Sequence, residues 1–311
     1  MLFRSPAPPR ATDPPFVSVV IASVNGFPWI GACLDALTQQ RGGIAYEILV
    51  LDRCGETVRE EIRRRFPQPE IRVLPVEGCP SIPKLRALGM AAARGRMIGI
   101  LEDHCNVPPT WFQSIGRAHR AGHRAIGSGV ENGAVERVID WAVFFCEYAK
   151  FMPPVQGGTG VEIPGNCAVY DRLALDLVGP EIRQEVWESF IHRRMAEEGV
   201  EFFCDPEMTV SHKREFPFGY FMSQRYHYSR SFAGMRLQNA PLSRRLLYAC
   251  ATPLLPPMLL WRMATTIRRK GRRKKEFITA VPVIGVFLLS WAWGEAVGAL
   301  FGPGDSLARV E

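Results

Sequence analysis

The chain has 311 residues, of which 47 % are hydrophobic and 22 % are charged. This balance is typical of a globular protein with a substantial core, and it excludes an intrinsically disordered chain. Much of the net charge of +7 belongs to one segment, because eight basic residues fall between Arg262 and Lys275. That segment lies between two apolar runs and has no interleaved aromatic residues. We therefore expect its partner to be an anionic lipid surface and not a nucleic acid.

The cysteines and the N-terminus indicate a reduced, cytosolic compartment. The eight cysteines are scattered, without a Cys-x-x-Cys pair or the spacing of a zinc site, so we expect free thiols. Residues 1–15 are rich in proline and lack the apolar centre of a signal peptide. We expect them to form a short disordered lead-in.

Strand and helix patterns alternate through the first third of the chain. Apolar, β-branched runs predict strands over Phe16–Ala22 and Glu47–Leu51, and the spacing of Ile30, Leu34 and Leu37 predicts a helix between them. The same criteria predict helices over Val58–Phe66 and Leu85–Arg94 and strands over Ile71–Pro75 and Met97–Leu101. Strands that alternate with helices form parallel sheets with right-handed crossovers. The expected fold class is therefore α/β.

Three polar residues directly follow the strand predicted over Met97–Leu101. They are Glu102, Asp103 and His104, and all three side chains can bind a metal ion. In open α/β sheets, ligands bind at the carboxyl ends of the strands. An ordinary polar turn that closes a strand is the alternative interpretation.

Six successive segments resemble family 2 glycosyltransferases of the nucleotide-sugar-binding type. They are VSVVIASVNG, EILVLDRCG, KLRALGMAAARG, IGILEDHCNVPPTW, PGNCAVYDR and VWESFIHRRMAEEGVEF, within residues 16–230. The resemblance implies a Rossmann-like GT-A sheet with flanking helices. It also implies inverting transfer of a sugar from a nucleotide-diphosphate donor.

The resemblance assigns two residues to the nucleotide. The acid that closes the second strand contacts the nucleobase or ribose in the family and is Asp52 here. The arginine before the long helix contacts the diphosphate and is Arg86. Two positions depart from the family pattern, since Ala87 replaces an asparagine and Ala22 replaces a proline.

The resemblance also implies a divalent cation, Mn²⁺ or Mg²⁺, at the diphosphate. The family's Asp-x-Asp motif falls on Glu102, Asp103 and His104, and either Asp103 or His104 is the direct metal ligand. Magnesium prefers oxygen ligands, so an imidazole ligand favours manganese. In some relatives a later histidine also binds the metal, and its counterpart here is His212. His212 could instead serve only to cap a strand.

The acceptor side of the predicted site has two candidates. The segment Trp187–Gly199 is predicted to be an amphipathic helix, and its opening matches a family motif whose second acid is Glu188. A carboxylate there would take the proton of the acceptor hydroxyl as general base. The alternatives are an acid that only stabilises the helix start, or Glu185 as base if the register slips. Asn166 is a candidate contact for the donor or acceptor sugar.

The segment Phe221–Arg230 loosely resembles the Gln-x-x-Arg-Trp motif of membrane polysaccharide synthases. Arg225 or Arg230 would then neutralise phosphates, and a solvated basic helix face is the alternative. We expect a glycosyltransferase domain over residues 16–235 and membrane-associated helices over residues 236–311, with a basic loop over residues 262–275.

The two C-terminal apolar runs differ in their capacity to cross a bilayer. Leu246–Trp261 has 16 residues and three prolines, whereas a span needs about 20 apolar residues. Phe277–Phe301 is long enough. A hairpin of both runs would place the basic segment on the far side, against the positive-inside tendency. We expect the first run to lie in the interface or re-enter, and the second to do likewise or cross once.

These features predict a cell-membrane enzyme whose catalytic domain lies on the cytoplasmic side. Its acceptor would be a lipid-linked or membrane-proximal glycan. A scaffold that binds a nucleotide sugar or a partner without catalysis is an alternative, which the altered metal motif and Ala87 favour. A dinucleotide-dependent oxidoreductase is disfavoured, because no Gly-x-Gly-x-x-Gly follows the first strand.

Overall fold

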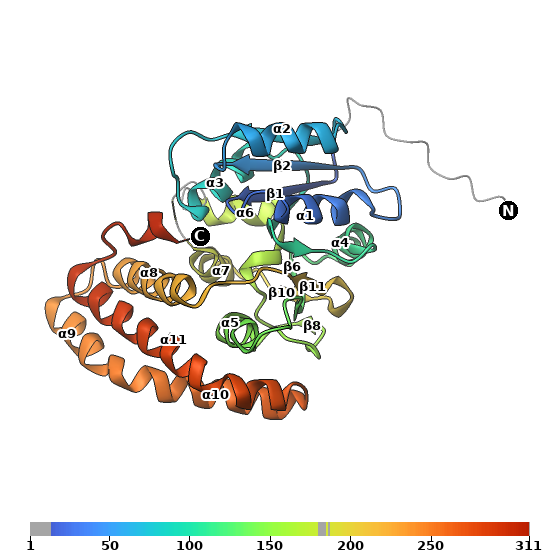
Figure 1. Cartoon of the computed structure of the whole chain (residues 1–311). Coiled ribbons are helices and arrows are strands. Elements are labelled where there is room, and N and C mark those ends of the chain that lie inside the picture. Colours follow the sequence, from blue (N-terminus) through green and yellow to red (C-terminus); the bar gives the residue numbers. More distant parts are fainter. Residues whose placement is uncertain (1–13, 180–184, 186, 311) are drawn as a thin grey trace. The chain divides into compact units, whose positions relative to one another are not determined.

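The computed structural model describes residues 14–179, 185 and 187–310, and the chain forms two compact units (Figure 1). The first unit consists of Met1–Glu77, Pro83–Ser128 and Gln156–Val210. The second consists of Gly78–Ile82, Gly129–Val155 and Ser211–Glu311. The domain limits expected from the sequence, residues 16–235 and 236–311, stay a prediction.

The first unit is built on a mixed sheet whose described strands have the order β3-β2-β1-β4-β9-β6-β10-β8. Four of them run parallel: β1 (Val17–Ser23), β2 (Tyr46–Asp52), β3 (Ile71–Pro75) and β4 (Met97–Glu102). The others are β6 (Ala125–Gly127), β8 (Gly158–Thr159), β9 (Val169–Asp171) and β10 (Phe202–Cys204). Every residue of β1 is buried, as expected for a strand with neighbours on both sides and helices on its faces.

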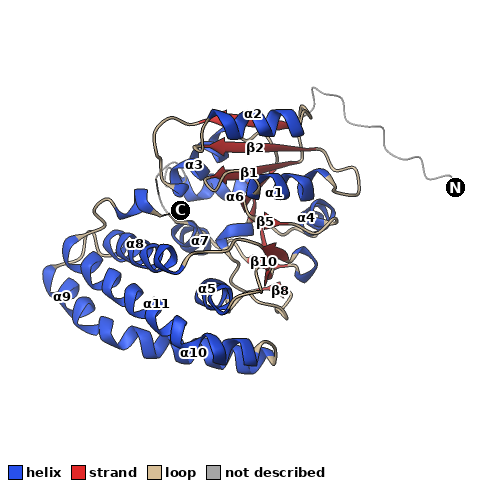
Figure 2. Cartoon of the chain, in the orientation of Figure 1, coloured by secondary structure: helices blue, strands red, loops and turns tan. Residues whose placement is uncertain are grey.

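Helices flank this sheet (Figure 2). They are α1 (Trp29–Thr38), α2 (Glu56–Arg65), α3 (Ile82–Ala92), α4 (Trp111–Arg120), α6 (Arg172–Val178) and α7 (Glu188–Glu197). Short elements complete the unit: β5 (Cys105–Asn106), η1 (Gly165–Cys167) and η3 (Pro206–Met208). On α3, a Cβ atom at Gly89 would overlap the side chains of Val20 and Leu51. The glycine therefore lets this helix lie directly on β1 and β2.

The structure confirms the predicted α/β class and each predicted strand and helix of residues 16–101, with boundaries shifted by less than a helical turn. The parallel arrangement holds for β3-β2-β1-β4 but not for β9, which runs antiparallel to both β4 and β6. Strand β9 does not follow β4 or β6 directly in the chain, so the crossover that makes successive strands parallel does not apply to these pairs.

The second unit is mainly helical (Figure 2). Its helices are α5 (Val138–Tyr148), α8 (Phe218–Arg236), α9 (Leu242–Ala251), α10 (Leu255–Lys270) and α11 (Lys274–Phe301), with η4 (Thr252–Leu254) and η5 (Ser306–Arg309). The short strands β7 (Val130–Asn132) and β11 (Val210–His212) are neighbours in a second sheet. Helix α11 packs along α8 and α5, and Figure 1 shows α8 and α11 side by side.

The basic segment 262–275, expected as a loop, is mostly helical. Residues up to Lys270 continue α10, and α11 begins at Lys274. The turn between them is short, because Gly271 adopts a left-handed conformation with φ of 70° and ends α10. Alanine, methionine, leucine, arginine and lysine, which fill much of α10, are good helix formers.

A buried carboxylate ties β1 and β2 to the turn before β4. Glu47 accepts hydrogen bonds from Ser18 Oγ (2.7 Å), the Arg94 backbone amide (2.7 Å) and Arg72 Nη1 (3.2 Å). Ser18 Oγ in turn accepts a bond from the Gly95 amide at 2.7 Å. Burial by itself would raise the pKa of the Glu47 carboxyl, but the hydrogen bonds from Ser18 and Arg94 lower it below its ordinary value.

We predict that Glu47→Gln lowers the free energy of unfolding by about 1–3 kcal/mol at neutral pH, because buried donors lose their charged acceptor. The lowered pKa means that wild-type stability from Glu47 is complete above its ordinary pKa and is lost as the pH falls through the folded value. Denaturant unfolding at several pH values tests this. The difference in free energy of unfolding between wild type and Glu47→Gln should disappear at acidic pH. Glu60→Gln, at an exposed position of α2, is the control, and equal stabilities of both variants would contradict the prediction.

Candidate active site

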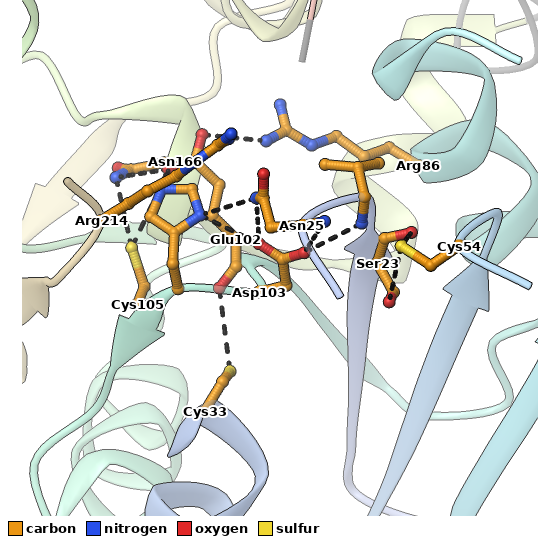
Figure 3. A network of polar contacts seen from close by, with 12 residues as sticks. Ser23, Asn25, Cys33, Cys54, Arg86, Glu102, Asp103, Cys105, Asn166 and Arg214 are labelled. Carbon is orange, nitrogen blue, oxygen red and sulfur yellow. Dashed lines mark hydrogen bonds and ion pairs between the residues drawn. The ribbon is translucent and has the colours of Figure 1, made fainter. Parts of the chain in front are cut away.

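The candidate residues gather where three parallel strands of the first unit end. In the sheet register, Ser23 of β1 lies opposite Asp52 of β2, and Ala22 lies opposite Glu102 of β4. The carboxyl ends of these strands therefore share one edge of the sheet, as predicted from the sequence. Figure 3 shows the polar network that this edge supports.

Asp103 is the hub of this network. Its Oδ2 accepts hydrogen bonds from the backbone amides of Val24 and Asn25, each at 2.9 Å, and its Oδ1 accepts one from Asn25 Nδ2 at 2.6 Å. The fourth bond comes from His104 Nδ1 at 2.9 Å. Burial alone would raise the pKa of the Asp103 carboxyl, yet the bonds from His104, Asn25 and Val24 lower it. Both oxygens of this carboxylate are thus fully engaged inside the protein.

His104 is oriented by that carboxylate. An ionised carboxylate only accepts hydrogen bonds, so Nδ1 of His104 is the donor in the bond to Asp103. Nε2 lies 3.5 Å from Oε2 of Glu102. A histidine fixed by a carboxylate behind it, with its second nitrogen beside another carboxylate, is an arrangement that suits a metal ligand.

Arg86, in α3, connects two acids of the site. Its Nη1 donates to Glu188 Oε1 at 2.5 Å, and its Nη2 lies 3.4 Å from Glu102 Oε1 (Figure 3 shows the contact with Glu102). Arg86 and Glu188 are both buried. A charge buried in this way needs its partner, because a lone buried charge costs several kcal/mol. The guanidinium thus holds two carboxylates that would otherwise repel each other.

Glu188 and Asn166 come together through the turn at η1. A Cβ atom at Gly165 would lie 2.9 Å from Cβ of Glu188, so only glycine leaves room for this acid. Asn166 Nδ2 lies 3.4 Å from Glu102 Oε2. The rival acid Glu185 is exposed and lies 3.8 Å from Lys84. The buried acid on α7 is therefore Glu188.

Asp52 lies at the end of β2 and is fully buried. Its carboxylate accepts bonds from Ser23 Oγ (2.9 Å), the Gly55 amide (3.2 Å) and Arg59 Nη1 (3.1 Å). The nucleotide role that the resemblance assigns to it stays a prediction.

Three further candidates belong to the second unit. His212 ends β11, with its ring 5.0 Å from that of Tyr148. The Cζ atom of Arg225 lies 4.2 Å from the ring centroid of Trp291. Arg230 Nε donates a hydrogen bond to the Gly302 carbonyl at 3.4 Å. The metal role of His212 and the phosphate roles of the two arginines stay predictions.

Sequence reasoning missed two contributors to this site. Asn25 is not among the residues that the sequence assigns to the site, although its side chain and amide donate hydrogen bonds to Asp103. Gly165 was passed over, although its missing side chain admits Glu188. The polar turn Ser-Val-Asn-Gly at the carboxyl end of a strand was the available signal for Asn25. No local signal pointed to Gly165.

The sequence of this chain was compared with family models and with curated proteins. A family model described as "Glycosyl transferase family 2" matches residues 18–177, slightly more than half of the chain. The chain belongs to glycosyl transferase family 2. A curated relative is the succinoglycan biosynthesis protein ExoO of Rhizobium meliloti (strain 1021), 28 % identical over 116 residues. That alignment covers 37 % of this chain and 33 % of the relative, so the match spans only a third of the relative's length.

Two solved structures resemble this chain in fold. The chain resembles the mannosyltransferase PcManGT of Pyrobaculum calidifontis, in complex with GDP-Man and Mn²⁺, with a TM-score of 0.58 and 14 % identity over 91 % of this chain and 88 % of the other. It also resembles S. aureus TarS 1–349, with a TM-score of 0.51 and 12 % identity over 90 % of each chain. These likenesses establish a GT-A-like α/β fold.

We predict that Asp103→Asn lowers the free energy of unfolding by about 1–3 kcal/mol, because an amide cannot accept all the hydrogen bonds that meet the carboxylate. The control is Asp176→Asn, which makes the same substitution at an exposed position of α6, outside the network. Thermal and denaturant unfolding of both variants measures the difference. Wild-type stability in Asp103→Asn would show that the network does not hold this edge together.

Proposed function

We propose that this chain is an inverting glycosyltransferase that moves a sugar from a nucleotide-diphosphate donor to a glycan acceptor at the membrane. The observation that carries the proposal is the joining of Glu188, Arg86, Glu102 and His104 at one end of the sheet. A buried carboxylate, a guanidinium and two side chains able to bind a metal ion thus lie close together, which supports the proposal. The other strong support is the membership of glycosyl transferase family 2.

The donor set fits a divalent cation. We assign Glu102 and the Nε2 atom of His104, both in the first unit, as ligands, and the metal role of His212 stays a prediction. Asp103 then acts as the positioning residue behind His104, since its own oxygens are engaged. An imidazole ligand favours Mn²⁺ over Mg²⁺. When bound, the cation would stabilise the charge of the leaving diphosphate.

Solved neighbours support this chemistry as analogues. PcManGT was solved with GDP-Man and Mn²⁺. GalNAc-T7 was solved with UDP, GalNAc and Mn²⁺, and it resembles this chain with a TM-score of 0.50 and 15 % identity over 65 % of this chain and 44 % of the other. For this chain we assign Asp52 to the nucleoside and Arg86 to the diphosphate. Asn166, whose buried Oδ1 has no hydrogen-bond partner among the described residues, is assigned to a sugar hydroxyl.

Glu188 is assigned as general base. In the structure its Oε1 accepts a hydrogen bond from Arg86, so this oxygen is not available to an acceptor hydroxyl. A diphosphate is a strong bidentate partner for a guanidinium. Arrival of the donor would therefore draw Arg86 toward the phosphates and release Glu188 for the acceptor hydroxyl. The base would become active only when the donor is in place, which would limit wasteful hydrolysis.

The acceptor and the location follow from the C-terminal helices. Of the described helices, α11 is the one long and apolar enough to cross a membrane by length and composition. Together with the succinoglycan-biosynthesis relative, this supports association with the cell membrane. Nucleotide sugars are cytosolic, so we assign the catalytic unit to the cytoplasmic side and the acceptor to lipid-linked or membrane-proximal glycans.

We predict that a nucleoside diphosphate binds more tightly with Mn²⁺ than with a chelator, and that His104→Ala removes this gain. The expected loss for the variant is about 10-fold or more in affinity. Calorimetry with and without the ion measures it. His123→Ala, a ring that instead stacks on Phe203, is the control. Equal affinities of wild type in both buffers would rule out the metal role and favour the non-catalytic scaffold.

We predict that Glu188→Gln lowers turnover by about 100-fold or more, because the amide keeps the shape of the side chain but cannot accept the proton. Nucleotide-sugar binding should survive. The measurement is release of nucleoside diphosphate from a panel of nucleotide sugars in the presence of Mn²⁺. Glu185→Gln, three residues earlier and exposed, is the matched control and should stay active. An active Glu188→Gln beside an inactive Glu185→Gln would move the base to Glu185.

A further inference from the structure

Helix α11 has the composition of a membrane span but the packing of a core helix. It is 28 residues long, and its most apolar 18-residue window has a mean hydropathy of 1.8. At 1.5 Å per residue such a helix is about 42 Å long, sufficient to cross a bilayer. Yet one face is buried against its own unit, with residues Phe277, Ala280, Ile284, Phe287, Leu288, Ala292, Gly294, Glu295, Gly298 and Ala299. Their spacing of three or four residues defines one continuous inner face.

The inner face contacts two helices of the second unit along its length. Near the start, Phe277 packs edge-on against Phe145 of α5 at 5.3 Å between ring centroids. Further along, Phe287 meets Phe221 of α8 at 4.8 Å. Gly298 then lies so close to the Arg230 carbonyl of α8 that any Cβ atom would overlap it. Helices α8 and α11 are therefore in close contact over several turns.

Helix α8 carries charges that a bilayer would not accept. Arg236 Nη2 binds Glu295 of α11 at 2.8 Å, and Arg225 lies over Trp291 of α11 and 3.5 Å from Glu147 of α5. If α11 crossed the membrane in this packing, α8 and its ion pairs would enter the hydrocarbon. Insertion of each charged residue at the centre of a span costs about 2.5–3.5 kcal/mol. The packing thus opposes a crossing that composition alone permits.

The opposite face of α11 is apolar and exposed. Ile278, Leu289 and Trp293 fall on it at the helical spacing, each with at least 63 % of its surface exposed. The preceding elements, which also contact α11, carry further exposed apolar side chains: Leu242, Leu246, Leu247, Tyr248, Leu254, Met258 and Trp261 from α9, η4 and α10. Full burial of a large apolar side chain contributes about 1.5–3 kcal/mol. We call this set, with the three α11 residues, the apolar collar.

Basic residues border the apolar collar. Arg262, Arg268, Arg269, Arg272, Lys274 and Lys275 are exposed at the end of α10 and the start of α11. An anionic bilayer surface attracts each of them with about 1 kcal/mol. A second copy of the chain on a two-fold axis would instead bring like charges together. Charge complementarity therefore selects an anionic lipid surface as the occupant of the collar.

We propose that the apolar collar docks in the plane of an anionic bilayer, with α11 lying along the membrane surface and both of its ends on the same side. This deepens the membrane association that is part of the proposed function and rests on it. The outer faces of α9, α10 and α11 enter the headgroup region, while α8 and α5 shield the inner face of α11 from solvent and lipid.

Flotation of the full chain with lipid vesicles tests the docking surface. We expect binding to vesicles that contain phosphatidylglycerol, weaker binding to phosphatidylcholine alone, and partial release at high salt. Leu247→Gln with Trp261→Gln should reduce binding at least 10-fold, and Arg268→Gln with Arg269→Gln should remove the preference for phosphatidylglycerol. The matched controls are Leu173→Gln and Arg120→Gln, exposed positions of the first unit, and they should bind as wild type.

Labelling of the vesicle-bound chain decides between lying along and crossing the membrane. Single cysteines replace Lys275, in the first turn of α11, and Ala308, in η5 beyond its last residue, in a chain whose exposed Cys54, Cys79 and Cys250 are serine. A membrane-impermeant thiol reagent should label both positions without detergent. Protection of one end alone would show that α11 crosses and would overturn the proposal. Absence of vesicle binding, with a dimer by light scattering, would also overturn it in favour of self-association.

Nucleotide binding by calorimetry separates this proposal from the proposed function. Collar variants that lose vesicle binding should keep wild-type affinity for the nucleoside diphosphate with Mn²⁺, which also shows that they fold. A chain that docks on vesicles as expected but neither binds nucleotide nor releases it from nucleotide sugars would overturn the proposed transfer and leave the docking surface intact.

Discussion

The first unit depends on one constraint: each of its buried carboxylates needs hydrogen-bond donors. Asp103 is buried at the carboxyl end of β4, and its charge is stable there only because donors from the chain after β1 and from His104 meet both of its oxygens. The same bonds fix the turn after β1 and the orientation of His104. Glu47 plays the corresponding structural role near the other end of the strands, where Ser18 and Arg94 meet it. The hydrogen bonds that stabilise the buried Asp103 carboxylate therefore also orient a side chain of the candidate site, His104.

A second constraint is the pairing of Arg86. A buried ion pair is seldom a net source of stability, because desolvation offsets its attraction. The value of the Arg86–Glu188 pair therefore lies in what it makes possible, since a carboxylate held by an exchangeable cation can be released by an anionic substrate. Gly165 permits the approach by having no side chain. This links a packing detail in η1 to the proposed timing of base catalysis.

The second unit shows why composition and packing must be considered together. Helix α11 satisfies the length and hydropathy of a span, but its buried face belongs to a soluble-type core that includes the Arg236–Glu295 ion pair. Its exposed face and the neighbouring α9 and α10 leave apolar surface in the open. The proposed in-plane position at a lipid surface would suit both faces, because the apolar outer face would meet lipid and the inner face would stay packed against α8 and α5.

The sequence alone determined the strands and helices of residues 16–101 and the edge of the sheet where polar residues gather. Local patterns carry that information, since alternation, helical spacing and strand-end acids are encoded within a few residues. It could not reveal that Glu188 meets Arg86, because the two residues are 102 positions apart, and it left Glu185 open as the alternative if the register slips. Nor could it reveal the antiparallel β9 or the buried face of α11. Those features arise from contacts between distant segments, and only the tertiary structure decides which of them form.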